Sequence, residues 1–286
     1  MSSNTSIGVP NISIGMPVYN GEKTIEAALD CVVKQTFRDF ELIISDNAST
    51  DGTEAICRKY ALKDSRIRYV RQHVNIGAVK NFHFVLNEAQ AKYFMWATSD
   101  DVKSFDFLEI NYFFLVGNLD YVASTCPTRF EGDVFNSKSM GDESLDDELP
   151  ERFKKYFNCW HANGRFCSLM RREAITNSIY LSQDFFGSDW ATMLSVIAIG
   201  KTYRHNKGYV VLGKDGFSNS GNIFKYYRKK NIHWILPFYE LILATCEMMK
   251  SFSIKNKIYI SYYLVKLNFQ AVRQLIRGEM KRLLVR

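Results

Sequence analysis

Four short apolar segments in the first hundred residues alternate with three segments of helical spacing. The apolar segments are rich in β-branched and aromatic residues and end in polar turns, at 12–16, 40–46, 67–72 and 92–98. The first segment between them places apolar side chains on one helical face: Ile25, Ala28, Leu29, Val32 and Val33. Strands that alternate with helices predict an α/β fold, with a parallel sheet covered by helices on both faces.

Polar residues gather where these predicted strands end. We expect the first strand to stop at Pro17, whereas the second ends on Asp46 and the fourth is followed by Asp100 and Asp101. In open parallel sheets, ligands bind beyond the carboxyl ends of the strands. The sequence therefore predicts one crevice lined by residues 17–20, 46–51 and 98–101.

Each of these strand ends has a functional and a purely structural interpretation. Asp100 and Asp101 are adjacent carboxylates that either bind Mg²⁺ or Mn²⁺, or cap the next helix and face water. Asp46 and Asn47 either hydrogen-bond a nucleotide base or form an Asx-turn. Tyr19 is either a stacking face or an ordinary turn aromatic. These residues alone leave both interpretations open.

Residues 11–102 closely resemble the start of family 2 glycosyltransferases. The resemblance rests on "ISIGMPVYNGEK", "DNASTDGT", "NIGAVKN" and "FMWATSDDV" at their spacings. A weaker resemblance continues through "LMRREAI" to "GSDW" near residue 190. It implies the GT-A (Rossmann-like) fold, an α/β architecture with a mixed, mostly parallel sheet flanked by helices. The sequence adds a C-terminal helical extension to it.

The resemblance implies a nucleotide-sugar site on the first strand ends. Pro17 and Tyr19 would line the base pocket, and Asp46 and Asn47 would lie at the base, with Asp46 hydrogen-bonded to it. Lys80 falls where the family often has arginine, near the diphosphate.

Two positions depart from the family's motifs. The usual Asp-x-Asp-Asp begins here with Thr98, so Asp100 and Asp101 would hold the ribose and the metal between them, and which one binds the metal stays open. Ser188 replaces the common glutamate of the later motif, but Asp189 still supplies the catalytic base.

The resemblance implies an inverting, metal-dependent transfer of a sugar from a nucleotide diphosphate, with UDP favoured, to a glycan or lipid-linked acceptor. The context expected is bacterial surface polysaccharide synthesis. Two alternatives share the fold. A nucleotidyltransferase would carry a Gly-rich phosphate loop after the first strand, where this chain has "PVYNGEK". A binding module without turnover would fit the carboxylate missing at Thr98, although Asp189 argues against it.

Charge suggests how the chain is divided. Residues 225–286 hold 13 basic and 3 acidic residues (+10), whereas the whole chain holds 37 and 30, which leaves 24 and 27 in 1–224. We expect a catalytic domain over 1–224, with a nucleotide-binding half (11–102) and an acceptor-side half (103–224). The basic, aromatic helical tail is expected to pack on the catalytic domain or on a second subunit, and its charge suits the anionic inner face of a membrane. No nucleic-acid-binding module accompanies it.

The remaining features are less specific. The N-terminus lacks the basic and apolar regions of a signal peptide, and six cysteines without CxxC spacing suggest reduced, mostly buried thiols, so we expect a cytoplasmic protein. The histidines form no zinc-like pair. We expect His161 and Arg165 to lie on a surface loop; the alternative is that they contact the acceptor or the diphosphate. We expect the acidic stretch 141–151 to be a solvated, mobile loop.

Overall fold

The computed structural model describes residues 8–158, 161–214 and 226–284. At its centre lies a seven-stranded sheet of order β3-β2-β1-β4-β8-β6-β9. Its strands are β1 (Ile12–Val18), β2 (Phe40–Asp46), β3 (Ile67–Arg71), β4 (Tyr93–Trp96), β6 (Tyr121–Thr125), β8 (Leu169–Arg171) and β9 (Lys201–Arg204). β8 runs antiparallel to β4 and β6, and the other pairs are parallel. The predicted α/β fold with a mixed, mostly parallel sheet is confirmed.

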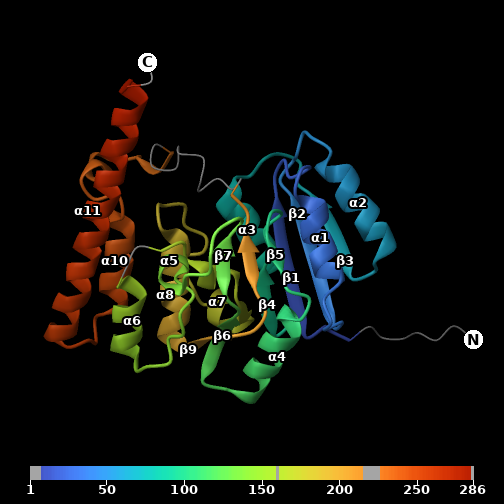
Figure 1. Cartoon of the computed structure of the whole chain (residues 1–286), viewed down its shortest axis with the longest axis horizontal. Helices are drawn as coiled ribbons and strands as arrows, with labels where there is room; N and C mark the ends of the chain where they lie inside the picture. Colours follow the sequence, from blue (N-terminus) through green and yellow to red (C-terminus); the bar gives the residue numbers. More distant parts are fainter. Residues whose placement is uncertain (1–7, 159–160, 215–225, 285–286) are drawn as a thin grey trace, which may run out of the picture.

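Helices cover both faces of this sheet (Figure 1). Each face has its own cluster of buried apolar side chains. One cluster includes side chains of α1 (Ile25–Val33), α2 (Thr53–Lys63) and α4 (Phe107–Gly117). The other includes side chains of α3 (Ala78–Asn87), α6 (Leu149–Phe157), α7 (Arg172–Thr176) and α8 (Ser188–Ile199). In β1, successive side chains point to opposite faces of the sheet, so Ile14 and Met16 both belong to the first cluster. Gly15 faces α3, where a Cβ atom would lie 2.6 Å from Val85 Cγ2, so the glycine allows close helix packing.

A second, three-stranded sheet flanks the strand ends. β10 (Val210–Leu212) lies between β5 (Val102–Lys103) and β7 (Thr128–Phe130), antiparallel to the former and parallel to the latter. Since β5 directly follows Asp101, this sheet brings the residues after β10 to the paired carboxylates.

The prediction that Pro17 ends the first strand is wrong, because β1 continues to Val18. Gly15 O accepts a hydrogen bond from Ala97 N, so in the alternating strand the backbone of Pro17 also faces the β4 side. β4 ends at Trp96, opposite Gly15. The N–H that proline lacks would therefore find no ladder partner, and the strand tolerates it.

The prediction of a solvated, mobile loop at 141–151 is also wrong. Leu145 is fully buried and pairs with Thr202 of β9 through hydrogen bonds in both directions. Asp142 is buried too, where it accepts a hydrogen bond from Thr128 N and faces Arg204. α6 begins at Leu149, with Pro150 in its first turn. Leu145 and the ion pair of Asp142 therefore hold this segment against the protein despite its acidic composition.

The C-terminal helices pack on the α6–α8 side of the sheet. After the short helix η3 (Asn231–Trp234), α10 (Tyr239–Met248) contacts α8, and α11 (Ile254–Leu284) contacts α6. Figure 1 shows α11 at the margin of the molecule farthest from α2 and β3. The predicted packing of the tail on the catalytic part is therefore confirmed for one helix face. The division proposed at residue 225 lies outside the described residues.

Candidate functional site

Asp46 ends β2 as a fully buried carboxylate that the protein itself satisfies. Its Oδ1 accepts a hydrogen bond from Ser49 N (2.8 Å) and its Oδ2 accepts one from the Tyr69 hydroxyl (2.7 Å). Burial, then the Asp46 carboxylate, raises the pKa of Tyr69. The bond to Ser49 N reaches three residues along the chain, one further than in the Asx-turn considered for Asp46. A base would bond this carboxylate only after local movement exposed it, and it would then share an oxygen that already has a donor.

Asn47 fastens the next loop to the strand end. Its Nδ2 donates to Asn75 Oδ1 (2.9 Å), and its Oδ1 accepts from Ile76 N (2.8 Å). The loop that leads into α3 is thereby held beside β2, and Lys80 is exposed on the first turns of that helix. Tyr19 follows β1 with half of its surface exposed (50%). Its ring is open to stacking by a ligand, as a base pocket requires.

Asp100 and Asp101 have different surroundings. Asp101 is 6% exposed, its Oδ2 lies 3.9 Å from Lys103 Nζ and accepts from Cys167 Sγ (3.6 Å), and its Oδ1 accepts from Gly213 N (3.4 Å). Asp100 is only half-buried, and its Oδ2 lies 2.2 Å from where a Cβ on Gly213 would be. The purely structural interpretation, in which these carboxylates cap a helix and face water, does not describe Asp101.

The donor set decides how a metal could bind here. No group of three or more His, Cys, Asp or Glu side chains in the described part of the chain is arranged to hold a metal ion. Mg²⁺ and Mn²⁺ nevertheless bind through one or two carboxylates when substrate phosphates and water complete the shell. Asp100, the more accessible of the two carboxylates, and Asp101, which lies 3.9 Å from Lys103 Nζ, could both contribute to a site of this kind.

Asp189 lies in the first turn of α8, as the sequence predicts. Asn163 Nδ2 donates a hydrogen bond of 3.0 Å to its Oδ2. Although the residue keeps exposed surface, the protein around its carboxylate raises its pKa by desolvation. Hydrogen bonds from Asn163 and from the Trp190 backbone act in the opposite direction. A carboxylate with a raised pKa at an exposed position is suited to take up a proton.

Asn163 is itself held on several sides. It is 2% exposed and adopts a left-handed conformation (φ 55°), which asparagine tolerates better than most residues. Tyr156 hydroxyl donates to its Oδ1 (3.2 Å), which leaves the Nδ2 group directed at Asp189. Its backbone N donates to His161 Nδ1 (3.0 Å). The amide that orients Asp189 therefore has little freedom to turn.

The prediction of a surface loop at His161 and Arg165 is wrong, since both are buried. The His161 ring stacks on Trp190 (4.0 Å between centroids) and its Nε2 donates to Tyr156 O (3.0 Å). Burial, with the nearby Arg165, lowers the pKa of His161 to about 3, so the ring is neutral. Arg165 donates through Nε to Glu143 O (3.0 Å). Both residues support the loop rather than face a ligand.

A short helix connects the surroundings of Asp189 with those of Asp101. η1 (Gly164–Cys167) begins directly after Asn163, which bonds Asp189, and ends on Cys167, which bonds Asp101. Four residues of 3₁₀-helix span about 8 Å. The residues that bond the predicted catalytic base and the predicted metal region thus lie at the two ends of one short helix.

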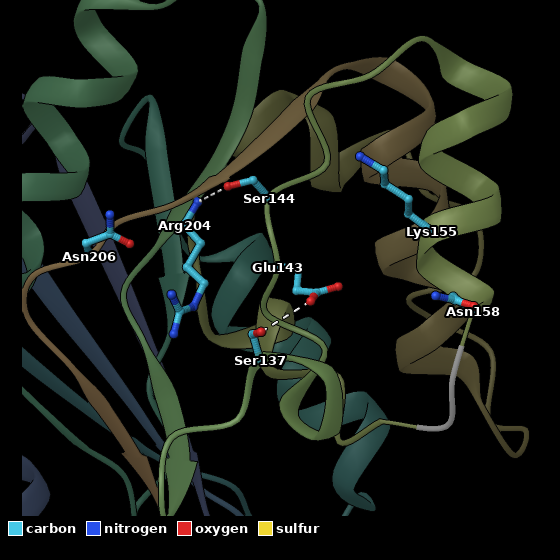
Figure 2. A pocket seen from close by; sticks show the side chains of 7 residues that line it. All are labelled: Ser137, Glu143, Ser144, Lys155, Asn158, Arg204 and Asn206. Atoms are coloured by element: carbon cyan, nitrogen blue, oxygen red, sulfur yellow. Dashed lines mark hydrogen bonds between the residues drawn. The ribbon is translucent and has the colours of Figure 1, made fainter.

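An open polar pocket of about 440 Å³ lies apart from these residues (Figure 2). Its lining consists of Ser137, Glu143, Ser144, Lys155, Asn158, Arg204 and Asn206. Its charged side chains have protein partners: Arg204 faces Asp142 and Lys155 faces Asp147. None of the site residues predicted from the sequence lines it, so we do not assign the donor to this pocket.

The comparisons with known proteins bear on this site. Residues 13–177 match the family model described as Glycosyl transferase family 2. A GalNAc(5)-diNAcBac-PP-undecaprenol beta-1,3-glucosyltransferase of Campylobacter jejuni is 24% identical over 198 residues, 69% of this chain and 63% of that protein. An Escherichia coli UDP-Glc:alpha-D-GlcNAc-diphosphoundecaprenol beta-1,3-glucosyltransferase, WfgD, is 31% identical over 119 residues, 39% of this chain and 46% of its own. The chain thus spans less than two thirds of either relative.

Solved structures of low sequence identity share the fold. Residues 1–349 of S. aureus TarS, in complex with UDP, superpose with a TM-score of 0.58 at 16% identity and cover 94% of this chain and 92% of that one. The mannosyltransferase PcManGT from Pyrobaculum calidifontis, in complex with GDP-Man and Mn²⁺, gives 0.55 at 16% identity, over 92% and 75%. The expected GT-A architecture is confirmed.

Sequence reasoning missed Asn163 as a partner of the site. It lies in "HANGRF", between His161 and Arg165, the two residues of this segment considered from the sequence. The signal present was an Asn-Gly pair, which favours a left-handed turn. That signal predicts the backbone conformation but not the contact with α8.

Proposed function

The chain belongs to glycosyl transferase family 2, and we propose that it transfers a sugar from a nucleotide diphosphate, with UDP as the nucleotide, to a hydroxyl of a glycan or lipid-linked acceptor. The observation that carries the proposal is the connector η1. This helix, about 8 Å long, separates the residue that bonds Asp189, a carboxylate of raised pKa, from the residue that bonds Asp101. We place the diphosphate beside Asp101. A nucleotide sugar that lies along η1 would present its anomeric carbon between Asp189 and Asp101.

The nucleotide would lie over the ends of β1 and β2. Tyr19 would stack on the base, beside Pro17, and Asp46 and Asn47 would form the polar floor at its edge. Lys80, exposed near the start of α3, would reach toward the phosphates. The support for this arrangement is that all five residues belong to strand ends and a following helix at one edge of the sheet, where such sheets bind ligands.

Mn²⁺ or Mg²⁺ would be held by Asp100, with Asp101 supporting from its buried position. When bound, the metal supplies positive charge to the leaving diphosphate. The chain's own contribution is to fix Asp101 between Lys103 and Gly213. This limits how far the adjacent Asp100 can move.

The reaction we propose is a single displacement. Asp189 accepts the proton of the acceptor hydroxyl while that oxygen forms a bond to the anomeric carbon. The bond between the anomeric carbon and the β-phosphate oxygen breaks, and the nucleotide diphosphate leaves with its electron pair. Attack from the face opposite the leaving group inverts the anomeric configuration. Asn163 holds Asp189 in place throughout.

The biological setting follows from the relatives by analogy. The two described above are named as beta-1,3-glucosyltransferases of undecaprenol-linked sugars. By that analogy this chain would act in the cytoplasm on a surface polysaccharide precursor, close to the inner face of the membrane. Residues 1–224 would form the catalytic part, with 11–102 binding the nucleotide and 103–224 meeting the acceptor.

The test is a transfer assay on the full chain with UDP-sugars, Mn²⁺ and a lipid-linked acceptor. We expect UDP release coupled to product, with the anomeric configuration of the product inverted by NMR. Asp189→Asn should abolish transfer and keep UDP binding, whereas Asp120→Asn, an exposed carboxylate before β6 at the opposite sheet edge, should change neither. Pyrophosphate release would instead indicate a nucleotidyltransferase. UDP binding without turnover on any donor would indicate a binding module.

A further inference from the structure

The outermost helix, α11, carries a second apolar face that the rest of the described chain leaves uncovered. One face of the helix is buried against α6 and its neighbours, through Ile260, Leu264, Leu267 and Ala271. Another set of large apolar side chains on the same helix is more than half exposed. This set, the outer stripe, consists of Ile254, Ile258, Tyr262, Val265, Phe269 and Ile276.

The outer stripe is a continuous band. Its members follow one another at intervals of three or four residues, with one interval of seven, which places them on one side of an α-helix. At 1.5 Å per residue the band is about 33 Å long. Phe269 is 68% exposed and Ile254 is 77% exposed. An exposed apolar band of this length on a soluble domain marks a surface that binds something.

The charges beside the outer stripe are all of one sign. Lys255, Lys266 and Arg273 are exposed, and their spacings of 11 and 7 residues, about three and two helical turns, align them along one edge of the band. The sequence contains no acidic residue between Glu247 and Glu279. The surface is therefore apolar along its centre and cationic along its edge.

We infer that the outer stripe docks on an anionic lipid bilayer, with α11 lying along the membrane surface. Apolar side chains would enter the interface between headgroups and acyl chains, and Lys255, Lys266 and Arg273 would lie at the anionic headgroups. The contact is peripheral, since none of the described helices is long and apolar enough to cross a membrane. The inference does not depend on the reaction proposed above.

A second copy of the chain is the less suitable occupant. Two outer stripes that met face to face would bring the rows of Lys266 and Arg273 into one interface, with no carboxylate from this part of either helix to neutralise them. A membrane rich in anionic lipid offers the opposite charge. Charge complementarity therefore selects the lipid surface.

The test is co-sedimentation of the full chain with vesicles of phosphatidylcholine alone and with vesicles of equal parts phosphatidylcholine and phosphatidylglycerol. We expect binding to the anionic vesicles at least tenfold tighter than to the neutral ones. Val265→Glu/Phe269→Glu should reduce binding to the anionic vesicles by more than tenfold. Each charge removed in Lys255→Gln/Lys266→Gln/Arg273→Gln should weaken it about fivefold.

The matched control is Leu62→Glu, which adds a charge at an 89% exposed leucine on α2, on the far side of the molecule. It should bind vesicles as the wild type does, and circular dichroism should show every variant folded. Equal binding to both vesicle types, or no effect of Val265→Glu/Phe269→Glu, would overturn the inference. So would a dimer in analytical ultracentrifugation that this double variant dissociates, because a second copy would then cover the stripe.

Discussion

Asn163 donates a 3.0 Å hydrogen bond to Asp189, across 26 residues of sequence, from a backbone conformation with φ 55°. The same asparagine is the last residue before η1, whose other end contacts Asp101. One short helix thus links the residue we propose as the base to the region we propose for the diphosphate. Asn163 is a positioning residue in this account, because it acts through Asp189.

Replacing Asn163 should change the pH profile as well as the rate. Asn163→Gly keeps the left-handed backbone accessible but removes the amide, so kcat should fall roughly ten- to a hundredfold. The hydrogen bond from Asn163 lowers the pKa of Asp189, so its loss raises that pKa further. Because the base must be deprotonated, the acidic limb of the kcat/KM profile should move to higher pH. An unchanged limb would mean that the asparagine only supports the fold.

Gly213 should be needed for the geometry of Asp100. In Gly213→Ala the new Cβ would lie 2.2 Å from Asp100 Oδ2, so the carboxylate must move. We expect UDP binding in the presence of Mn²⁺ to weaken at least tenfold, measured by calorimetry. Gly117→Ala, where a Cβ meets nothing within 4 Å, is the control and should bind as the wild type does. Equal affinities for the two variants would remove Asp100 from the donor site.

Buried His161 should make stability depend on pH. Its pKa is about 3 in the folded protein against 6.5 for the ordinary group, so the unfolded chain binds more protons between these values. The free energy of unfolding is therefore unaffected by this difference above pH 6.5. It decreases as the pH falls toward 3, by up to about 1.4 kcal/mol per pH unit. Urea denaturation at pH 7.5 and 5.0 measures it.

A variant pair isolates His161 in that measurement. His161→Phe can still stack on Trp190 but does not titrate, so stability should be lower at pH 7.5 and should fall less toward pH 5.0. The loss at pH 7.5 should be about 1–3 kcal/mol, because Asn163 N loses its acceptor. Exposed His73→Gln should leave the pH dependence of the wild type. The same slope in His161→Phe as in the wild type would contradict the assignment.

The hydroxyl of Tyr69 should hold Asp46 for the nucleotide. Tyr69→Phe removes the 2.7 Å hydrogen bond and should cost about 1 kcal/mol of stability in urea denaturation. The carboxylate is then held less firmly, so we expect UDP affinity to fall a few-fold, whereas Asp46→Ala should reduce it at least tenfold. If Asp46→Ala left UDP affinity intact, the carboxylate would serve the turn alone.

The local patterns of the sequence were sufficient for the first four strands of the central sheet and the helices between them. Strand 40–46 agrees with β2 to the residue, because its apolar run and its end on Asp46 are local signals. The apolar pattern of residues 185–200 likewise predicts a helix whose first turn carries Asp189, and α8 has it there. Such features depend on neighbours along the chain, which a sequence displays directly.

Contacts between distant segments were not predictable in this way. The burial of residues around Leu145 depends on its pairing with Thr202, and the local acidic composition indicated the opposite. The environment of Asp101 depends on Cys167, 66 residues away, and that of Asp189 depends on Asn163. No periodicity in one segment reports on such partners.

The most direct test of the central claim is UDP binding by calorimetry, with and without Mn²⁺, to the wild type and to Asp100→Ala. Asp120→Asn, whose carboxylate pairs with Lys201 at the opposite edge of the sheet, is the control. We expect Mn²⁺-dependent binding to the wild type and the control, weakened at least tenfold in Asp100→Ala. Folded wild-type protein that binds no UDP, or that binds it equally without Mn²⁺ and in Asp100→Ala, would contradict a metal-supported nucleotide site at these strand ends.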